Sequence, residues 1–279
     1  MTKMRQNSSP SDDELVLLLN EIVQLARTAG AAIMQVYRSE DFGASTKADN
    51  SPLTLADLAA HNCIVAGLSK LLLAYPILSE EDANIPYTVR SKWTRFWLVD
   101  PLDGTKEFLK RNGEFTVNIA LIENGVPVLG VVYAPVLNVC YYAVRGNGAF
   151  VQRGEGPAQA IKAVAHTSTA PVKVVASRSH SDERTTVLLK KMGEHECISM
   201  GSSLKLCLVA EGAAHIYPRL GPTMEWDTAA AHAVVNEAGG IVCGLSQQSL
   251  RYNKEDLHNP EFLVVAKTDI ALLQLLINI

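Results

Sequence analysis

The stretch from Phe96 to Thr105 constrains the fold most, because an apolar strand there runs directly into two aspartates. The apolar residues 96–99 predict a buried strand, and Pro101 and Gly104 predict a sharp turn after it. A buried carboxylate without a partner costs on the order of several kcal/mol, so Asp100 should be paired or bound to a metal ion. A helix starting at Gly104 would offer backbone N–H groups to a phosphate. A plain strand and turn is the alternative interpretation.

Composition limits the class of protein. The 279 residues, 48% of them hydrophobic, can form one large domain or two ordinary ones. The 29 acidic and 25 basic residues give a net charge of −4, which argues against a nucleic-acid partner but is compatible with a small anionic ligand. The first ten residues do not resemble a signal peptide, and no uninterrupted apolar run approaches the roughly 18–20 residues of a membrane span. Five scattered cysteines without a CxxC pair predict buried thiols in a reducing, cytoplasmic compartment.

The N-terminal half has an α+β pattern. Apolar residues at helical spacing predict a helix from Asp12 to Tyr37. Thr54 and Asp57 form a T-x-x-D capping box that predicts a second helix reaching Leu73. An antiparallel meander follows, with a tight turn at Glu123–Gly125 and strands at 116–122, 126–133, 139–144 and 149–152.

The C-terminal half has an α/β pattern. Residues 153–170 are rich in Gly, Ala, Ser, Thr and Pro, and we place a domain boundary there, between an N-terminal domain of residues 1–160 and a C-terminal domain of residues 161–279. Beyond it, short strands alternate with helices, which predicts a sheet that is at least partly parallel. We expect strands at 172–176, 197–200, 214–217 and 262–266, and helices at 182–192, 203–211 and 228–238.

Two further acidic motifs accompany Asp100 and Asp103. The first is Glu80-Glu81-Asp82 after an apolar run, which on its own reads as a solvated charge cluster. The second is Glu225-Trp226-Asp227 before the helix expected at 228–238, where Asp227 alone reads as an N-cap. Carboxylates and carbonyls are the ligands that Mg²⁺ prefers, so a shared site would suit that ion.

In combination and in this order, the three acidic motifs, with Glu-Ala-Gly-Gly closing the last helix, resemble those of the inositol monophosphatase-like phosphatases over nearly the whole chain. The resemblance implies a five-layer α-β-α-β-α sandwich and Mg²⁺-dependent, lithium-sensitive hydrolysis of phosphomonoesters. It also implies a set of metal ligands, namely Glu80, Asp100, the Leu102 carbonyl, Asp103 and Asp227.

The charge of the four carboxylates agrees with this implication. Their formal charge of −4 would be neutralised by two Mg²⁺ ions, and a third ion is a further option. A two-metal site can activate a water and stabilise the leaving oxygen. Thr105 would lie beside that water as a catalytic residue, with Glu80 or Asp49 as the second partner of the water.

Other segments resemble the bisphosphate nucleotidase branch of the same superfamily. They are the K-x-D-x-S-P-L-T loop at 47–54, Ser-Arg-Ser-His at 177–180, Gly-Ser-Ser-Leu-Lys at 201–205 and Tyr-Pro-Arg at 217–219. This resemblance implies removal of the 3′-phosphate of adenosine 3′,5′-bisphosphate to give AMP in sulfate assimilation, with the corresponding phosphosulfate as a second substrate. It also implies a cytoplasmic enzyme, or one held peripherally at the inner membrane, and leaves the oligomeric state open.

A bisphosphate needs cations for the phosphate that is not cleaved. Lys205 and Arg219 could supply them, with donors from the helix start at Ser202. The alternative is that Lys205 and Arg219 are surface charges, Ser202 an N-cap and His180 a loop residue. The expected substrate-binding residues are Glu80, Leu102, Asp103, Gly104, Thr105, His180, Ser202, Lys205, Arg219 and Asp227.

Two rival functions stay open at this point. An inositol monophosphatase or a sugar-bisphosphate phosphatase would share the metal site without needing Lys205 and Arg219. A catalytically silent sensor that binds phosphorylated ligands is a rival of a different class, although the intact set of acidic residues speaks against it.

Overall fold

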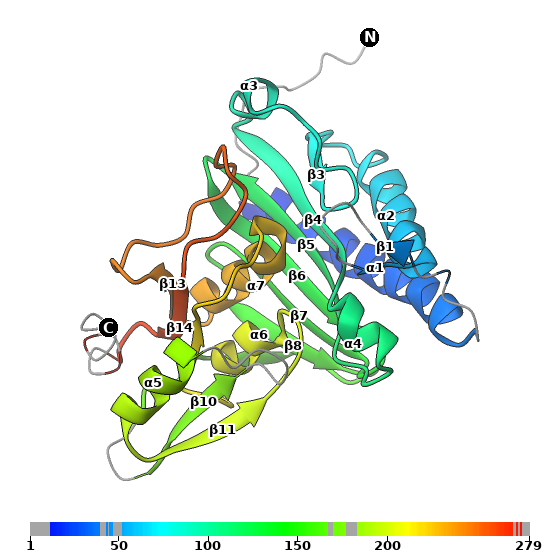
Figure 1. Ribbon diagram of the computed structural model, residues 1–279. Helices are drawn as coiled ribbons and strands as arrows, with labels where there is room; N and C mark the ends of the chain where they lie inside the picture. The colour runs from blue at the N-terminus through cyan, green and yellow to red at the C-terminus, as the bar shows by residue number, and fades with distance from the viewer. Residues whose placement is uncertain are drawn as a thin grey trace.

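Two β-sheets alternate with three layers of helices in this chain (Figure 1). The computed structural model describes residues 12–39, 43, 45–46, 52–166, 170–176, 183–269, 272 and 274. Helices α1 (Asp12–Tyr37) and α2 (Leu55–Leu68) cover the outer face of the larger sheet. Helices α6 (Leu204–Ala210) and α7 (Glu225–Glu237) lie between the sheets, and α5 (Glu183–Met192) covers the outer face of the smaller one. The expected five-layer α-β-α-β-α sandwich is confirmed.

The larger sheet has seven strands in the order β3-β4-β5-β6-β7-β8-β9. Strand β3 is parallel to β4, and the other neighbours are antiparallel, as expected for a meander. Asn124 and Gly125 connect β5 to β6 with φ values of 51° and 74°, the left-handed conformation of a two-residue hairpin turn. The strands are β3 (Ile77–Ser79), β4 (Arg95–Asp103), β5 (Thr116–Glu123), β6 (Val126–Ala134), β7 (Val139–Val144), β8 (Ala149–Arg153) and β9 (Gln159–Ile161).

The smaller sheet has five strands in the order β11-β10-β12-β14-β13. Strand β10 is parallel to both β11 and β12, and β14 is antiparallel to β12 and β13, so the predicted partly parallel sheet is confirmed. The strands are β10 (Val172–Ala176), β11 (His195–Ser199), β12 (Ile216–Arg219), β13 (Gly240–Gly244) and β14 (Phe262–Ala266). Short elements complete the description: β1 (Ser45–Thr46), β2 (Pro52–Leu53), α3 (Tyr87–Arg90) and α4 (Thr105–Leu109).

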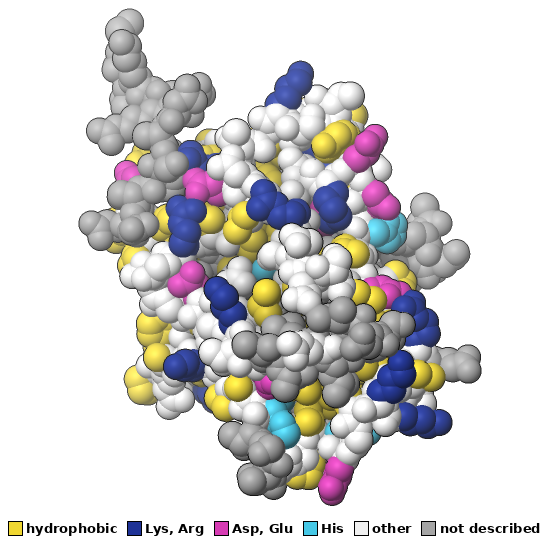
Figure 2. All heavy atoms as spheres, turned by 90° about the vertical axis from the view of Figure 1, so that its left-hand side faces the viewer, with side chains coloured by type: hydrophobic (Ala, Val, Ile, Leu, Met, Phe, Trp, Pro, Cys, Tyr) yellow, Lys and Arg dark blue, Asp and Glu magenta, His cyan; other side chains and the backbone are white. Residues whose placement is uncertain are grey.

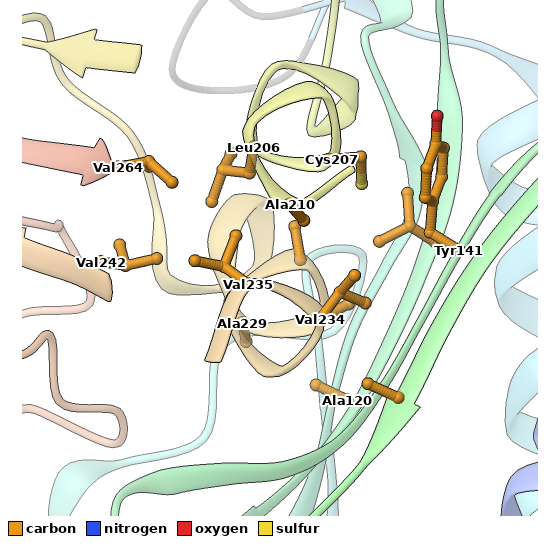
Figure 3. Packing of buried hydrophobic residues seen from close by; sticks show 14 of the residues in the cluster. Ala120, Tyr141, Leu206, Cys207, Ala210, Ala229, Val234, Val235, Val242 and Val264 are labelled. Carbon is orange, nitrogen blue, oxygen red and sulfur yellow. The ribbon is translucent and has the colours of Figure 1, made fainter. Parts of the chain in front are cut away.

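The alternation of β4 decides where its aspartates point. Trp97 and Val99 pack against α1 and α2, whereas Phe96 and Leu98 belong to the core around α6 and α7. Because side chains alternate along a strand, Asp100 follows Phe96 and Leu98 toward α7. Figure 3 shows this central core, in which side chains of α6 and α7 fill the space between Val242 and Val264 of one sheet and Ala120 and Tyr141 of the other.

Helix α1 is a core helix by its contacts. Residues 14–37 are long and apolar enough to cross a membrane, and α1 is the one such helix in the described part of the chain. Its residues Leu15, Ile22, Ala26 and Ile33 are nevertheless fully buried against the larger sheet and α2. The helix is thus accounted for by packing within the fold.

Several boundaries differ from the sequence predictions. Helix α2 ends at Leu68 instead of Leu73. Helix α7 begins at Glu225, so Met224 is the N-cap and Asp227 lies inside the first turn, contrary to the N-cap interpretation. Strand β4 continues through the expected turn to Asp103, with a register shift after Asp100. Cys197 is exposed and Cys63 is half-buried, whereas all five thiols were expected to be buried.

The expected domain boundary stays a prediction. Strand β9 was not predicted; it falls within the 153–170 stretch and extends the larger sheet to Ile161, one residue past the proposed first domain. The largest hydrophobic cluster combines residues from both proposed domains, such as Leu98 and Val264.

Gly130 on β6 allows α7 to approach the larger sheet. A Cβ atom at Gly130 would lie 2.1 Å from the carbonyl oxygen of Ala230 in α7, so the helix or the strand would have to move. We expect Gly130→Ala to destabilise the protein by about 1–3 kcal/mol, the usual cost of overpacking. Thermal unfolding should show a decrease in Tm of about 3–10 °C. Gly244→Ala is the control, because its Cβ would make only contacts of 3.6 Å or longer; equal effects of the two variants would contradict this account.

Candidate active site

Three aspartates meet between β4 and α7. Asp100 and Asp103 come from the end of β4, and Asp227 comes from the first turn of α7. One carboxylate oxygen of each lies within 4.8 Å of the other two. The amide of Leu102 donates to Asp100 Oδ1 at 3.0 Å, which closes the bulge that turns both aspartates of β4 into the site. The amide of Met224 fixes Asp227 in the same way, at 2.9 Å from Oδ2.

Glu80 lies beside this cluster. It follows β3, whose parallel pairing with β4 continues through a hydrogen bond from the Glu80 amide to the Val99 carbonyl at 3.0 Å. Burial raises the pKa of Asp100 well above its usual range, and the charge and a side-chain hydrogen bond of Glu80 raise it further. The four acids predicted as metal ligands are therefore neighbours in the structure.

The electrostatics of the cluster fit a divalent cation. Burial raises the pKa of Asp103 to about 6 although Lys205 and the Ser203 amide lower it. Burial and the charge of Asp103 raise the pKa of Asp227 to about 8. Buried carboxylates that repel one another need positive charge to stay ionised. Hard oxygen donors are the ligands that Mg²⁺ and similar ions prefer, so the residues present fit the metal that the sequence predicted.

Thr105 contacts a carboxylate that the sequence analysis missed. Its Oγ1 donates to Asp57 Oδ1 at 3.3 Å and lies 3.5 Å from the Leu102 carbonyl oxygen. The other oxygen of Asp57 accepts from the amide and hydroxyl of Thr54, at 2.8 and 2.6 Å. The capping box was predicted correctly, but as a helix start alone. The signal was present in the T-x-x-D motif, although only the fold brings its second oxygen to Thr105.

The backbone conformation at position 104 requires glycine. Its φ of 95° lies in the left-handed region, which favours glycine. It is the N-cap of α4, a helix of only five residues. A phosphate contact from the Gly104–Thr105 amides stays a prediction.

A cavity of about 140 Å³ extends from Asp103 and Asp227 toward basic residues. Ser202, Lys205 and Arg219 also line it. Lys205 is 8% exposed, and its Nζ donates to the Ser202 carbonyl at 2.6 Å. Burial lowers the pKa of Lys205, whereas the charge of Asp103 raises it. Lys205 is therefore not a surface charge, and the N-cap of α6 is Ser203, so the alternative interpretations of Lys205 and Ser202 are wrong.

Other basic side chains lie on the surface of the protein. On the face shown in Figure 2, Lys and Arg side chains stand in separate groups between apolar and acidic ones. Arg219, at the end of β12, donates from Nη2 to the Pro222 carbonyl at 2.9 Å. A more open hollow of about 430 Å³ adjoins the cavity and shares Asp103, Gly104 and Asp227 with it.

Most of the predicted site residues are thus brought together. Asp100, Asp103 and Asp227 cluster with Glu80 beside them, and Leu102 and Thr105 adjoin them. Gly104, Ser202, Lys205 and Arg219 line the cavity. Asp49 and His180 lie outside the described residues. The roles assigned to these residues stay predictions.

The chain was compared with known proteins. Residues 15–276 match the model of the inositol monophosphatase family. The chain is 53% identical to the 3′(2′),5′-bisphosphate nucleotidase CysQ of Salmonella typhimurium and 52% identical to that of Escherichia coli, in each case over 88% of this chain and 99% of the relative. Its fold matches the crystal structure of CysQ from Bacteroides thetaiotaomicron with a TM-score of 0.80 and 46% identity, covering 91% of this chain and 98% of that one. The chain therefore belongs to the inositol monophosphatase family.

Proposed function

We propose that this chain is a Mg²⁺-dependent 3′(2′),5′-bisphosphate nucleotidase of sulfur metabolism that acts in the cytoplasm. Its substrate would be adenosine 3′,5′-bisphosphate, which it converts to AMP and phosphate, and the corresponding phosphosulfate would be a second substrate. The names of the relatives support this activity. The observation that carries it is the cavity that joins the aspartate cluster to Lys205 and Arg219.

The shape of the charge distribution favours a bisphosphate. One phosphate would face the carboxylates and their metal ions, and the other would face Lys205 and Arg219. An inositol monophosphatase would need only the first of these positions. Arg219 presents a planar fork suited to phosphate oxygens, and Lys205 a point charge of reduced hydration.

Glu80, Asp100, the Leu102 carbonyl, Asp103 and Asp227 would hold the metal ions. We propose two Mg²⁺ ions, which would balance the four carboxylates. When bound, such ions polarise the phosphoryl group and lower the pKa of a bound water.

The protein itself would orient the attacking water through Thr105. Because the Thr105 hydroxyl donates its proton to Asp57, its oxygen can accept a hydrogen bond from the water. That bond would turn the lone pair of the water toward phosphorus. Asp57 is held by Thr54, so the pair is fixed before the substrate arrives. Glu80 or Asp49 would accept the second hydrogen bond of the water.

The two-domain organisation, with residues 1–160 as the metal-binding domain and residues 161–279 as the substrate domain, is part of the same proposal. Asp227 crosses this division, because it belongs to the second segment in sequence and to the aspartate cluster in space. The active site would therefore form only where the two segments pack together.

Mg²⁺ should stabilise the metal-free protein, and more at pH 8 than at pH 5.5. In the folded protein the pKa values of Asp103 and Asp227 are raised from the ordinary value of 3.8 to about 6 and about 8. Without metal the folded protein therefore loses stability as the pH rises from about 4 to 8. Mg²⁺ at a hundred times its Kd stabilises the folded protein by about 2.7 kcal/mol, which raises Tm by about 5–10 °C. Differential scanning fluorimetry measures the shift. Asp103→Asn should remove most of the Mg²⁺-induced increase in Tm and abolish hydrolysis. The control Glu196→Gln, on the exposed part of β11, should keep both. Equal increases in Tm at the two pH values would contradict the account.

Replacing Thr105 should affect the chemical step. We expect Thr105→Ala and Asp57→Asn each to lower kcat by about a hundredfold while KM changes little, because the lost interaction acts in the transition state. Thr105→Ser keeps the hydroxyl and serves as the matched control. Steady-state kinetics with saturating Mg²⁺ separates the two constants. A raised KM with normal kcat would make Thr105 a binding residue instead.

Replacing Lys205 should change the choice of substrate. A charge-assisted hydrogen bond contributes about 1.5–3 kcal/mol, so Lys205→Ala should lower kcat/KM for adenosine 3′,5′-bisphosphate roughly ten- to a hundredfold. Inositol 1-phosphate lacks the second phosphate, and its kcat/KM should change little. The two substrates are compared on wild type, Lys205→Ala and the surface control Lys190→Ala at one Mg²⁺ concentration. Equal losses on both substrates would mean that Lys205 supports Asp103 and not the uncleaved phosphate.

A further inference from the structure

A chain of buried hydrogen bonds joins β5 to the start of α6 behind the aspartate cluster. Thr116 and Asn118 are two residues apart on β5, so their side chains point to the same face of the sheet. The Thr116 and Ser203 hydroxyls lie 2.9 Å apart, and Ser203 Oγ donates to Asn118 Oδ1 at 2.9 Å. Asn118 Nδ2 then donates to Asp103 Oδ2 at 3.4 Å. The three side chains Thr116, Asn118 and Ser203 are at most 2% exposed.

The direction of these hydrogen bonds follows from the number of protons that each side chain can donate. The Ser203 hydroxyl has one proton and gives it to Asn118, so it must accept from Thr116. The Asn118 carbonyl accepts, and its amide donates to Asp103. Every donor in the chain therefore points toward the Asp103 carboxylate.

Ser203 is also unusual in its position. It is the N-cap residue of α6, where a serine hydroxyl normally accepts from the backbone of its own helix. Here it makes no such cap, because its hydroxyl is used by Asn118 and Thr116. Its backbone amide also donates to Asp103 Oδ2, at 2.6 Å. Ser203 thus contacts Asp103 directly through its backbone and indirectly through Asn118.

The peptide group between Ser202 and Ser203 has a partner at each end. Its N–H donates to Asp103, and its C=O accepts from Lys205 Nζ at 2.6 Å. Ser202 has a φ of 48°, a left-handed conformation that is unfavourable outside glycine and persists only where its surroundings hold it. Its buried Oγ lines the cavity and has no hydrogen-bond partner among the described residues. A rotation of this peptide group would break both hydrogen bonds together.

We propose that Ser203 and Asn118 are positioning residues, and that the peptide group they hold couples cation binding at Asp103 to binding of the uncleaved phosphate at Lys205. This inference rests on the proposed function. A cation at Asp103 and a phosphate at Lys205 each favour the same orientation of the peptide group, which contacts both residues. Coupling of this kind is reciprocal, so Mg²⁺ tightens phosphate binding by the factor by which phosphate tightens Mg²⁺ binding.

The coupling can be measured with AMP, which keeps the phosphate that is not cleaved. Isothermal titration calorimetry gives the Kd of AMP with and without Mg²⁺, and the ratio of the two values is the coupling factor. We expect a factor of about 5–150 for wild type. Ser203→Ala should lower it at least fivefold, and Asn118→Ala serves as a second variant if Ser203→Ala does not fold. Thr116→Val is the matched control: it also removes one buried hydrogen bond but leaves the link from Ser203 to Asp103, so it should keep the wild-type factor.

The outcomes separate this inference from the proposed function. If wild type fails to hydrolyse adenosine 3′,5′-bisphosphate, the proposed function fails. If wild type is active but Ser203→Ala and Asn118→Ala keep its coupling factor and lose only Tm, as Thr116→Val does, the hydrogen-bond chain is structural and the inference is overturned. A wild-type factor near one, or AMP binding that Lys205→Ala leaves unchanged, would overturn it as well.

Discussion

Mutual repulsion among buried carboxylates is the constraint on which the rest of this structure depends. Asp100 is 1% exposed, and its neighbours Asp103 and Asp227 approach it within a distance at which all three cannot stay charged without compensation. A fold that keeps such a cluster together gives up stability in the metal-free state. Natural proteins accept this at functional sites, where stability and activity compete. The surrounding elements must therefore hold the aspartates rigidly, so that the metal ions and not a rearrangement of the backbone relieve the repulsion.

The rigidity comes from polar contacts at the start of α7 as much as from the apolar core. Glu225 is fully buried, and its carboxylate accepts from the amides of Asn253 and Lys254, at 2.6 and 3.0 Å. Asn253 is held in turn by Arg90, which donates to its Oδ1 at 3.0 Å and comes from the segment between β3 and β4. Asn259 donates to the Met224 carbonyl at 2.7 Å. The segment 253–259 thus ties the helix that carries Asp227 to the strands that carry the other acids.

How much could be predicted from sequence depended on whether the information was local. The tight turn between β5 and β6 and the capping box of α2 are written in neighbouring residues, and both were predicted correctly. Asp227 was assigned to the N-cap because Asp is a good cap; in the structure it is the N3 residue, and its carboxylate accepts from the amide of the N-cap residue Met224. Strand β9 was missed because it has only three residues, is largely exposed and pairs only with β8. The contact between Asp57 and Thr105 joins residues 48 positions apart and has no local signal.

The positions of Lys205 and Arg219 would allow one metal site to serve a substrate with two phosphates. Under the proposed function, two Mg²⁺ ions balance the charge of −4 on the four carboxylates, which leaves the charges of Lys205 and Arg219 for the second phosphate. A phosphomonoester carries about −1.5 to −2 near neutral pH, close to the +2 of these side chains. Burial would strengthen the contact of Lys205 with the phosphate, since Lys205 has already lost most of its hydration in the folded protein. Under the same proposal these contacts would persist in AMP, which keeps the phosphate that is not cleaved. The enzyme would therefore keep part of its affinity for the product AMP. AMP would bind more weakly than the substrate because it lacks the phosphate that faces the metal ions.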